Sequence, residues 1–245
     1  MLYDNFVNAY EKTFEECSRT IGRILKAFLQ LKGKGHLLDA GCGNGCISEI
    51  FCSVDWEITG IDLSKSMISR ALGRELPNCQ FLIGDCLKLP FGSGIFDVYL
   101  GNLLINNLKD PKTLLTEAYR VLKPDGMILL TYPICRLQTD LLKIMKSALR
   151  SVKIGPKSSK PPNFLQHLSE FSSVQHSCIP IGLNLKSGLE ACQFLSPLKE
   201  IKQLEKLNLK QAVFQFISSK VDQLLSQNKC LVFEICFVVG KKLGL

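Results

Sequence analysis

The sequence lacks the features of several protein classes. It has three histidines, and none of its eleven cysteines falls in a CxxC pair, so no zinc-ribbon pattern is present. No apolar run approaches the roughly 20 residues of a membrane-spanning helix, and the most apolar stretch, CLVFEICFVVG, includes Glu234. The first residues, MLYDNFVNAYEKTFEEC, are acidic and polar, unlike a secretory signal peptide. We therefore expect a cytoplasmic protein with free thiols, no membrane span and no metal site.

The composition is that of a globular protein. Hydrophobic residues make up 46% and charged residues 21% of the chain, which is enough apolar material for a full core. The net charge of +8 permits an anionic partner, although solubility is the commoner origin of such a charge. No RNA-binding module is recognisable in the C-terminal half, so nucleic acid is not an expected partner. P-loop, nucleophile-elbow and HExxH motifs are also missing.

Apolar runs alternate with helically spaced segments as far as Pro133. The runs HLLDAG, WEITGIDLS, CQFLI, IFDVYLGNLLIN and MILLTYPI are expected strands. Helices are expected over 12–32, 46–55, 64–76 with Ser64 as N-cap, and 110–126, closed by Pro124 and Gly126. Connections this long exclude hairpins and predict a parallel sheet with helices on both faces.

The pattern weakens after Pro133. We expect a helix from Leu137 to about Val152, the mobile linker KIGPKSSKPPN, and a helical stretch at Phe164–Phe171. Residues 185–205 are expected to form a helix running into a sixth strand, 209–225 a helix, and 229–242 a last strand. The whole predicts one α/β domain over 1–245, with a doubly wound, mostly parallel seven-stranded sheet. Residues 134–184 form either a cap over the carboxyl edge of the sheet or a surface insertion without a role.

The stretch HLLDAGCGNGCIS places three glycines between a strand and a helix. Here bare backbone and a helix N-terminus can face a nucleotide-like ligand. Asp62 ends the next strand, 21 positions after Gly41, which is the spacing of a carboxylate that binds a ribose. A purely structural glycine turn is the alternative. Cys46 occupies the slot where a GxGxxG fingerprint has its last glycine, which counts against NAD.

Five segments then occur in order: LLDAGCGNG, GIDLSKSMI, GDCLKLPF, FDVYLGNLLINNLKDP and EAYRVLKPDGMILLTYP. This series resembles the signature segments of class I S-adenosylmethionine-dependent methyltransferases, above all the small-molecule branch that includes quinone-biosynthesis enzymes. The resemblance covers about residues 36–133. It implies a Rossmann-like methyltransferase fold, S-adenosylmethionine as the methyl donor and S-adenosylhomocysteine as the product. A family-like strand–helix–strand ending follows after residue 185, and residues 134–184 lie outside the resemblance.

The resemblance also implies a cofactor site. Asp39 would face the methionine amino end of the cofactor, and Gly41 and Gly43 would let the backbone approach it. Asp62 would bind the ribose hydroxyls, and Leu63 would pack on the adenine.

Five further positions complete this implied set. Asp85 and the backbone of Cys86 would recognise the adenine edge, and Gly101 and Asn102 would line the methionine moiety. Tyr10 would cover the cofactor. Alternatively, Asp85 is a turn residue, Asn102 a loop cap and Tyr10 a helix-packing residue.

The catalytic residues are unknown from sequence. His167 and His176 are candidates for a general base, whereas His36 at the start of a strand fits a structural role. Methyl transfer from a sulfonium is an in-line displacement that needs alignment and exclusion of water, and a base only when the acceptor must lose a proton.

The acceptor is expected to be a small molecule or a modified peptide. Leu103 and Leu104 follow Asn102, unlike the Asn/Asp-Pro-Pro-aromatic segment of methyltransferases that act on amide or nucleobase nitrogens. Two alternatives remain: a catalytically silent binding or scaffold subunit of the same fold, and a nicotinamide oxidoreductase. The sequence gives no indication of oligomeric state.

Overall fold

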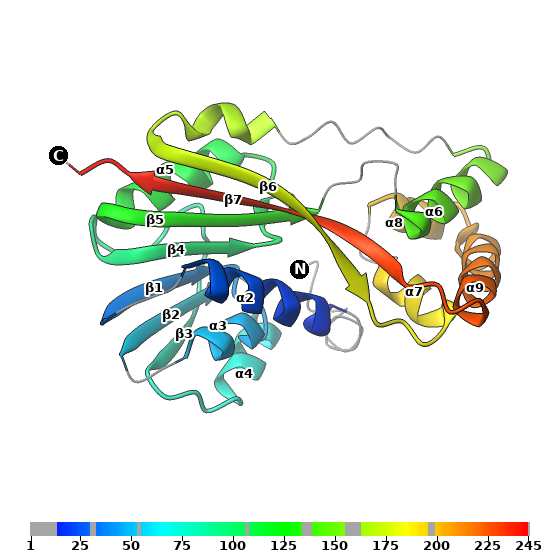
Figure 1. The fold of residues 1–245 in the computed structure, drawn as a ribbon, viewed down its shortest axis with the longest axis horizontal. Coiled ribbons are helices and arrows are strands. Elements are labelled where there is room, and N and C mark those ends of the chain that lie inside the picture. Colours follow the sequence, from blue (N-terminus) through cyan, green and yellow to red (C-terminus); the bar gives the residue numbers. More distant parts are fainter. Residues whose placement is uncertain are drawn as a thin grey trace.

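A seven-stranded sheet forms the centre of the structure (Figure 1). The computed structural model describes residues 14–29, 33–52, 55–105, 108–133, 139–154, 163–195 and 199–244. The strands are β1 (Gly35–Ala40), β2 (Trp56–Asp62), β3 (Cys79–Ile83), β4 (Phe96–Asn102), β5 (Leu122–Pro133), β6 (Phe171–Leu183) and β7 (Leu231–Lys242). Their order is β3-β2-β1-β4-β5-β7-β6. The pairings among β1–β5 are parallel, and β7 is antiparallel to β5 and β6, which confirms the predicted fold class.

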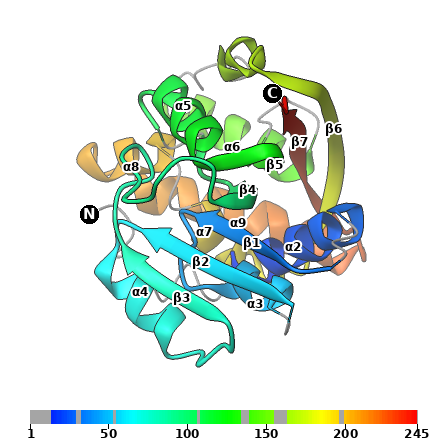
Figure 2. The ribbon, with the colours of Figure 1, turned by 90° about the vertical axis from the view of Figure 1, so that its left-hand side faces the viewer.

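Helices cover both faces of the sheet. The helices are α2 (Glu15–Leu29), α3 (Cys46–Phe51), α4 (Lys65–Leu72), α5 (Pro111–Val121), α6 (Asp140–Ser151), the 3-10 helix η2 (Asn163–Leu168), α7 (Gly188–Leu195), α8 (Lys199–Lys206) and α9 (Lys210–Ser226). Neighbouring residues of β1 show the two faces. Leu37 packs in a cluster with α2 and α3, and Leu38 in a cluster with α5 and η2. Figure 2 shows α5 and α3 on opposite sides of the sheet.

Helices α6, α7, α8 and α9 gather beyond the ends of β4 and β5, and β6 and β7 run on into this group (Figure 1). We call α6–α9 the helical lobe. Its core is apolar and includes Leu149 of α6, Cys192 of α7, and Ile217 and Val221 of α9. None of the described helices is long and apolar enough to cross a membrane.

Residues 185–205 do not contain the expected sixth strand, because they form α7 and α8. In α8, Ile201 and Leu204 are buried three positions apart, which is helical spacing. The sixth strand is β6, whose residues 173–180 are exposed. As the edge of the sheet, β6 carries Ser, Gln and His where an inner strand would carry apolar residues, and it tolerates Pro180.

The helix expected over 110–126 ends earlier, at Val121. Leu122 already pairs with Phe96 of β4, so pairing in the sheet begins before Pro124 is reached. Ser64 is confirmed as the N-cap of α4, since its side chain accepts a hydrogen bond from the Met67 amide.

The segment 134–184 is divided among three places. Residues 140–151 form α6 of the helical lobe, and 171–183 form β6 of the sheet. Between them, Phe164 and Leu168 are buried in the core cluster on the α5 face, as is Phe171 at the start of β6. The expected linker lies mainly at 155–162, outside the described residues.

The expectation of free thiols is wrong for one pair. Cys178 and Cys236 form a disulfide between β6 and β7, with an S–S distance of 2.01 Å. The two residues are direct register partners, which places their sulfur atoms together. The other described cysteines are free: Cys17, Cys42, Cys46, Cys52, Cys79, Cys86, Cys192 and Cys230.

Candidate functional site

The glycine turn lies between β1 and α3, at the carboxyl ends of the parallel strands. Gly41, Gly43 and Gly45 have φ angles of 69°, 56° and 77°. This left-handed region is open to glycine at little cost and disfavours other residues. The amides of Gly41 and Cys42 both donate to the Ile61 carbonyl oxygen, at 2.8 and 3.1 Å. The turn is therefore anchored to the end of β2.

Asp62 joins the turn to the next helix. Its Oδ2 accepts a hydrogen bond from the Gly43 amide at 3.0 Å, and its Oδ1 accepts one from the Ser64 amide at 2.9 Å. The residue remains partly exposed at the carboxyl edge of the sheet. A carboxylate fixed by two amides and open on one side is well placed to accept hydrogen bonds from ligand hydroxyls.

Asp39 lies beside this carboxylate and is buried, with 1% exposure. The Ser48 hydroxyl donates to its Oδ2 at 2.6 Å. The pKa of Asp39 is raised to about 7, mainly by burial; the hydrogen bond from Ser48 lowers this pKa, and the negative charge of Asp62 raises it. A cationic group bound nearby would favour the ionised form. The pair of carboxylates can therefore hold a ligand that has hydroxyls and a positive charge.

The three residues expected at the adenine differ in their surroundings. Leu63 is 49% exposed, which leaves an apolar surface open beside Asp62. Asp85 Oδ1 accepts a hydrogen bond from the Leu87 amide at 2.9 Å, so its side chain does form a local turn. Cys86 is buried, and burial raises the pKa of its thiol to about 12, so this cysteine is not a nucleophile at neutral pH.

Asn102, at the end of β4, is held from two sides. Its Oδ1 accepts a hydrogen bond from the Thr131 hydroxyl of β5 at 2.6 Å, and its Nδ2 lies 3.5 Å from Ser18 Oγ of α2. Thr131 Oγ1 also accepts from the Leu103 amide, and Leu103 has a φ of 51°. A non-glycine residue in this region marks backbone strain. Asn102 is thus part of a fixed network and not a free loop cap.

Gly101 precedes Asn102 in a tightly packed position. A Cβ added to it would lie 2.9 Å from Leu130 Cδ2, and one added to Gly41 would lie 2.9 Å from Leu104 Cδ1. Leu104 therefore lies over the glycine turn. This contact was not expected, because an apolar residue after a strand carries no signal of such a role.

A charged network, also not foreseen, ties α2 to the turn. Arg74 donates to the Asn44 carbonyl oxygen at 2.6 Å, to Glu49 at 2.8 Å and to Glu15 at 2.9 Å. Asn44 Nδ2 in turn donates to Glu15 at 2.8 Å. Burial raises the pKa of Glu15, but hydrogen bonds from Arg74, Asn44 and Arg19 outweigh it and hold that pKa below its usual value. The partners lie up to 59 positions apart, so local patterns could not reveal them.

The histidines lie elsewhere. His167 lines a hollow between η2 and α5 with Lys112 and Thr116, and none of the residues that line it belongs to the glycine-turn site. His176 is on the edge strand β6, bonded to Tyr132. His36 contacts the Thr59 hydroxyl at 2.9 Å, in agreement with a structural role. Tyr10 lies outside the described residues.

Known proteins share both the sequence pattern and the fold. Residues 38–130 match a family model described as a methyltransferase domain. A malonyl-[acyl-carrier protein] O-methyltransferase of Erwinia billingiae is 27% identical over 196 residues, which cover 79% of this chain and 73% of that protein. A demethylmenaquinone methyltransferase of Paenarthrobacter aurescens is 28% identical over 152 residues, 60% of this chain and 59% of that protein.

Among solved structures, phosphoethanolamine N-methyltransferase 2 of Haemonchus contortus shares the fold. That structure contains phosphomonomethylethanolamine and S-adenosylhomocysteine. It is 20% identical with a TM-score of 0.57, and the match covers 90% of this chain and 52% of that one. The span matched by the family model contains the glycine turn, Asp62, Asp85 and Asn102.

Proposed function

We propose that this chain is a class I S-adenosylmethionine-dependent methyltransferase, which its match to the methyltransferase-domain family model and its similarity to an O-methyltransferase support, and that it methylates a small molecule held between the carboxyl edge of the sheet and the helical lobe. The cofactor supplies a methyl group on a sulfonium, which is a strong leaving group. The protein has to bind the cofactor and the acceptor, align them and keep water out. Proximity and orientation can lower an activation free energy by roughly 7–11 kcal/mol, and several kcal/mol of this are expected here.

The observation that carries the cofactor site is the arrangement of Asp62 beside the glycine turn. Its carboxylate, fixed by the Gly43 and Ser64 amides, would accept the ribose hydroxyls. Asp39 would lie near the methionine ammonium, and the exposed face of Leu63 would cover the adenine. This donor set fits the cofactor, because the ribose hydroxyls and the methionine ammonium would each have a carboxylate as partner.

Alignment of the methionine end would fall to Asn102. Its two bonds, to Thr131 and towards Ser18, fix the amide in one orientation. Because no described histidine lies in the glycine-turn site, the acceptor is proposed to supply its own nucleophile without a histidine base. A carboxylate or an amine that is already deprotonated satisfies this condition.

The acceptor is further proposed to carry a negative charge. Lys146 of α6 is 8% exposed and forms no salt bridge with a described residue. Thr139, the N-cap of the same helix, has a buried hydroxyl without a hydrogen-bond partner among the described residues. A buried cation is costly unless it is paired. A carboxylate or phosphate on the acceptor would pair with Lys146 and bond to Thr139.

The cofactor site is tested by calorimetry with S-adenosylhomocysteine. Asp62→Ala should weaken binding about 10- to 100-fold, because charge-assisted hydrogen bonds of roughly 1–3 kcal/mol are lost. Asp125→Ala is the control, since Asp125 is 67% exposed and pairs with Lys241. Equal affinity of Asp62→Ala and wild type would remove Asp62 from the site.

The acceptor is tested by following S-adenosylhomocysteine formation with malonyl-acyl-carrier protein, phosphoethanolamine and demethylmenaquinol. Turnover should be confined to the charged acceptors. Lys146→Met should raise the KM for the active one about tenfold or more, whereas Lys143→Met, whose side chain is 58% exposed, should not. Turnover of the neutral quinol alone would contradict the anionic acceptor. Binding of cofactor without turnover of any acceptor in a wider panel would favour the silent-subunit alternative.

Two expectations stay predictions. The protein is expected to be cytoplasmic, which cell fractionation tests. It is also expected to be a single domain whose acceptor site is capped, and the proposed cap now includes α6 together with α7–α9.

A further inference from the structure

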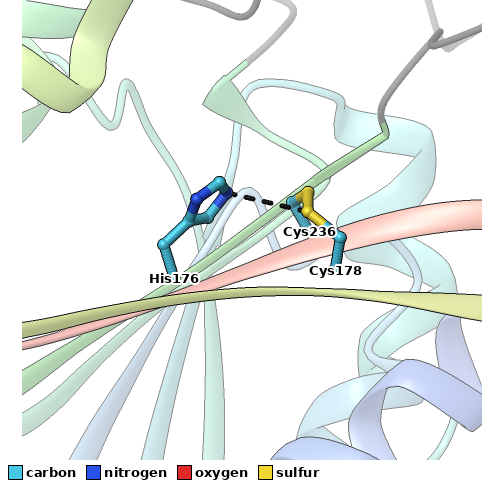
Figure 3. Close-up of side chains that lie close together, drawn as sticks. All are labelled: His176, Cys178 and Cys236. Carbon is cyan, nitrogen blue, oxygen red and sulfur yellow. Dashed lines mark hydrogen bonds between the residues drawn. A yellow bond between two sulfur atoms is a disulfide. The ribbon is translucent and has the colours of Figure 1, made fainter.

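Three metal-binding side chains meet where β6 and β7 pair. Cys178 lies directly opposite Cys236, with their Cα atoms 4.1 Å apart. His176 is two residues before Cys178, so it projects from the same face of β6. On the other side of β7, Tyr132 of β5 is the register partner of Cys236. Figure 3 shows the imidazole turned towards the two sulfur atoms.

The contacts bring these groups within ligand distance of one another. His176 Nε2 lies 3.8 Å from Cys178 Sγ and 2.7 Å from the Tyr132 hydroxyl. The rings of His176 and Tyr132 are stacked, with an interplanar angle of 8°. The histidine nitrogen and both sulfur atoms lie within 4.8 Å of one another. Cys236 is buried, and His176 and Cys178 are exposed, so the cluster opens to solvent on one side.

Two thiolates and an imidazole are a ligand set that suits Zn²⁺. With Zn–S near 2.3 Å and Zn–N near 2.0 Å, a tetrahedral site separates sulfur and nitrogen by about 3.5 Å. The observed 3.8 Å between Cys178 Sγ and His176 Nε2 is close to that value. The two sulfur atoms are bonded to each other and would have to separate.

We propose that reduction of the Cys178–Cys236 disulfide creates a Zn²⁺ site formed by Cys178, Cys236 and His176. A dithiol reductant supplies two electrons and two protons: the protein disulfide breaks to two thiols, and the reductant becomes a disulfide. Zn²⁺ then displaces the two thiol protons, two Zn–S bonds form, and His176 Nε2 leaves the Tyr132 hydroxyl to coordinate the metal. Water takes the fourth position.

The disulfide and the metal exclude each other, and each one cross-links β6 to β7. The edge strand thus stays attached in both redox states. The site is independent of the cofactor site, because none of its residues contacts the glycine turn in the described structure.

The test uses the full chain, reduced with a phosphine under nitrogen and freed of reductant. Zn²⁺ titrated against a chromophoric chelator should bind at one ion per chain with release of about two protons. Co²⁺ in its place should give thiolate-to-metal charge-transfer absorption. The oxidised chain, with the disulfide intact by mass spectrometry, should bind at least about 100-fold more weakly.

Variants identify the ligands. Cys178→Ser and His176→Ala change exposed side chains, so folding should survive, and each should weaken Zn²⁺ binding more than about tenfold. Cys230→Ser and His167→Ala are matched controls and should bind as wild type, since Cys230 is a free exposed cysteine and His167 lies on η2. Equal binding by oxidised and reduced chains, or full binding by Cys178→Ser or His176→Ala, would overturn the proposal.

Discussion

The parallel part of the sheet differs from the antiparallel β6–β7 pair and the helical lobe in how the sequence specifies it. In the parallel part, β1 and β2 each lead through a short turn into the next helix, and the turn residues after β1 bond to the adjacent strand, as Gly41 does to Ile61. In the β6–β7 pair, partners are far apart in sequence: Cys178 and Cys236 are separated by 58 positions. The parallel part is therefore specified by local sequence patterns, whereas the β6–β7 pair is specified by the register between strands that are distant in sequence.

The two regions also bury different groups. At the carboxyl edge of the parallel part, Asp39, Asn44, Ser48 and Ser64 are all at most 2% exposed. Buried polar groups cost free energy unless each finds a partner. In the helical lobe, the packing between α7 and α9 is mainly apolar. Changes in the first region should therefore alter ligand binding, and changes in the second should alter stability.

The largest expected effect is loss of cofactor binding in Gly43→Val. Gly43 has a φ of 56°, where a β-branched residue is strained, and its amide donates to Asp62. Rotation of this peptide would remove the bond that fixes the proposed ribose ligand. Calorimetry should detect no binding of S-adenosylhomocysteine to a chain whose circular dichroism is unchanged.

Gly94→Val is the matched control. Gly94 has a φ of 68°, a Cβ added to it would have nothing within 4 Å, and it lies in the loop before β4. The backbone strain is comparable, so stability should fall similarly while affinity stays at the wild-type value. If both variants bind equally well, the glycine turn serves the fold alone.

The next effect is the pH dependence contributed by Asp39. Its folded-state pKa is raised from 3.8 to about 7, so the folded state holds a proton that the unfolded state has lost. The stabilisation is full below about pH 4 and is lost as pH rises to about 7, a total of about 4 kcal/mol. Urea unfolding of the ligand-free protein at several pH values should show this slope. Asp39→Asn should flatten it, and Asp55→Asn, at an exposed position, should not.

The sequence predicted much of the parallel part because its signals are local. Glycines between a strand and a helix, and an acid at the end of the next strand, are enough to identify Gly43 and Asp62 as neighbours. The contact between Asp39 and Ser48 was not predicted, because no sequence pattern around either residue indicates the other as its hydrogen-bond partner. The roles assigned to these residues in cofactor binding remain predictions.

The second region was predicted less well for a physical reason. β6 is an edge strand, so both of its faces meet water around His176 and no apolar alternation marks it. The disulfide depends on a register that only the paired strands define. Residues 185–205 contain Leu, Ile and Phe at spacings from which a helix followed by a strand was predicted. Packing against α9 stabilises helices α7 and α8 there instead.

A smaller effect is expected in the helical lobe. A Cβ on Gly188 would clash with the Ser218 carbonyl oxygen, where α7 crosses α9. Because that atom is backbone, Gly188→Ala must push the helices apart, at a cost of roughly 1–3 kcal/mol. Thermal unfolding should show the loss, and S-adenosylhomocysteine affinity should be unchanged. Gly92→Ala, in ordinary contact with Ile95, is the control. A large loss of affinity in Gly188→Ala would show that lobe packing and the cofactor site are coupled.

The smallest effect concerns Arg74, which joins α2, α3 and the glycine turn. Its guanidinium is partly exposed, at 20%, so its pairs with Glu15 and Glu49 are screened by solvent and should contribute only about 1 kcal/mol to stability. Arg120 offers a close match: it pairs with Glu117 and donates to backbone carbonyl oxygens, but away from the turn. Arg74→Gln and Arg120→Gln should therefore lower the unfolding temperature by similar amounts. They should differ in binding, because Arg74 alone of the two holds the turn through the Asn44 carbonyl oxygen. A roughly threefold loss of S-adenosylhomocysteine affinity, about 0.7 kcal/mol, is expected for Arg74→Gln and none for Arg120→Gln. Equal affinities would mean that the turn keeps its shape without α2, and that the hydrogen bonds its amides donate to Ile61 and Asp62 suffice to hold it.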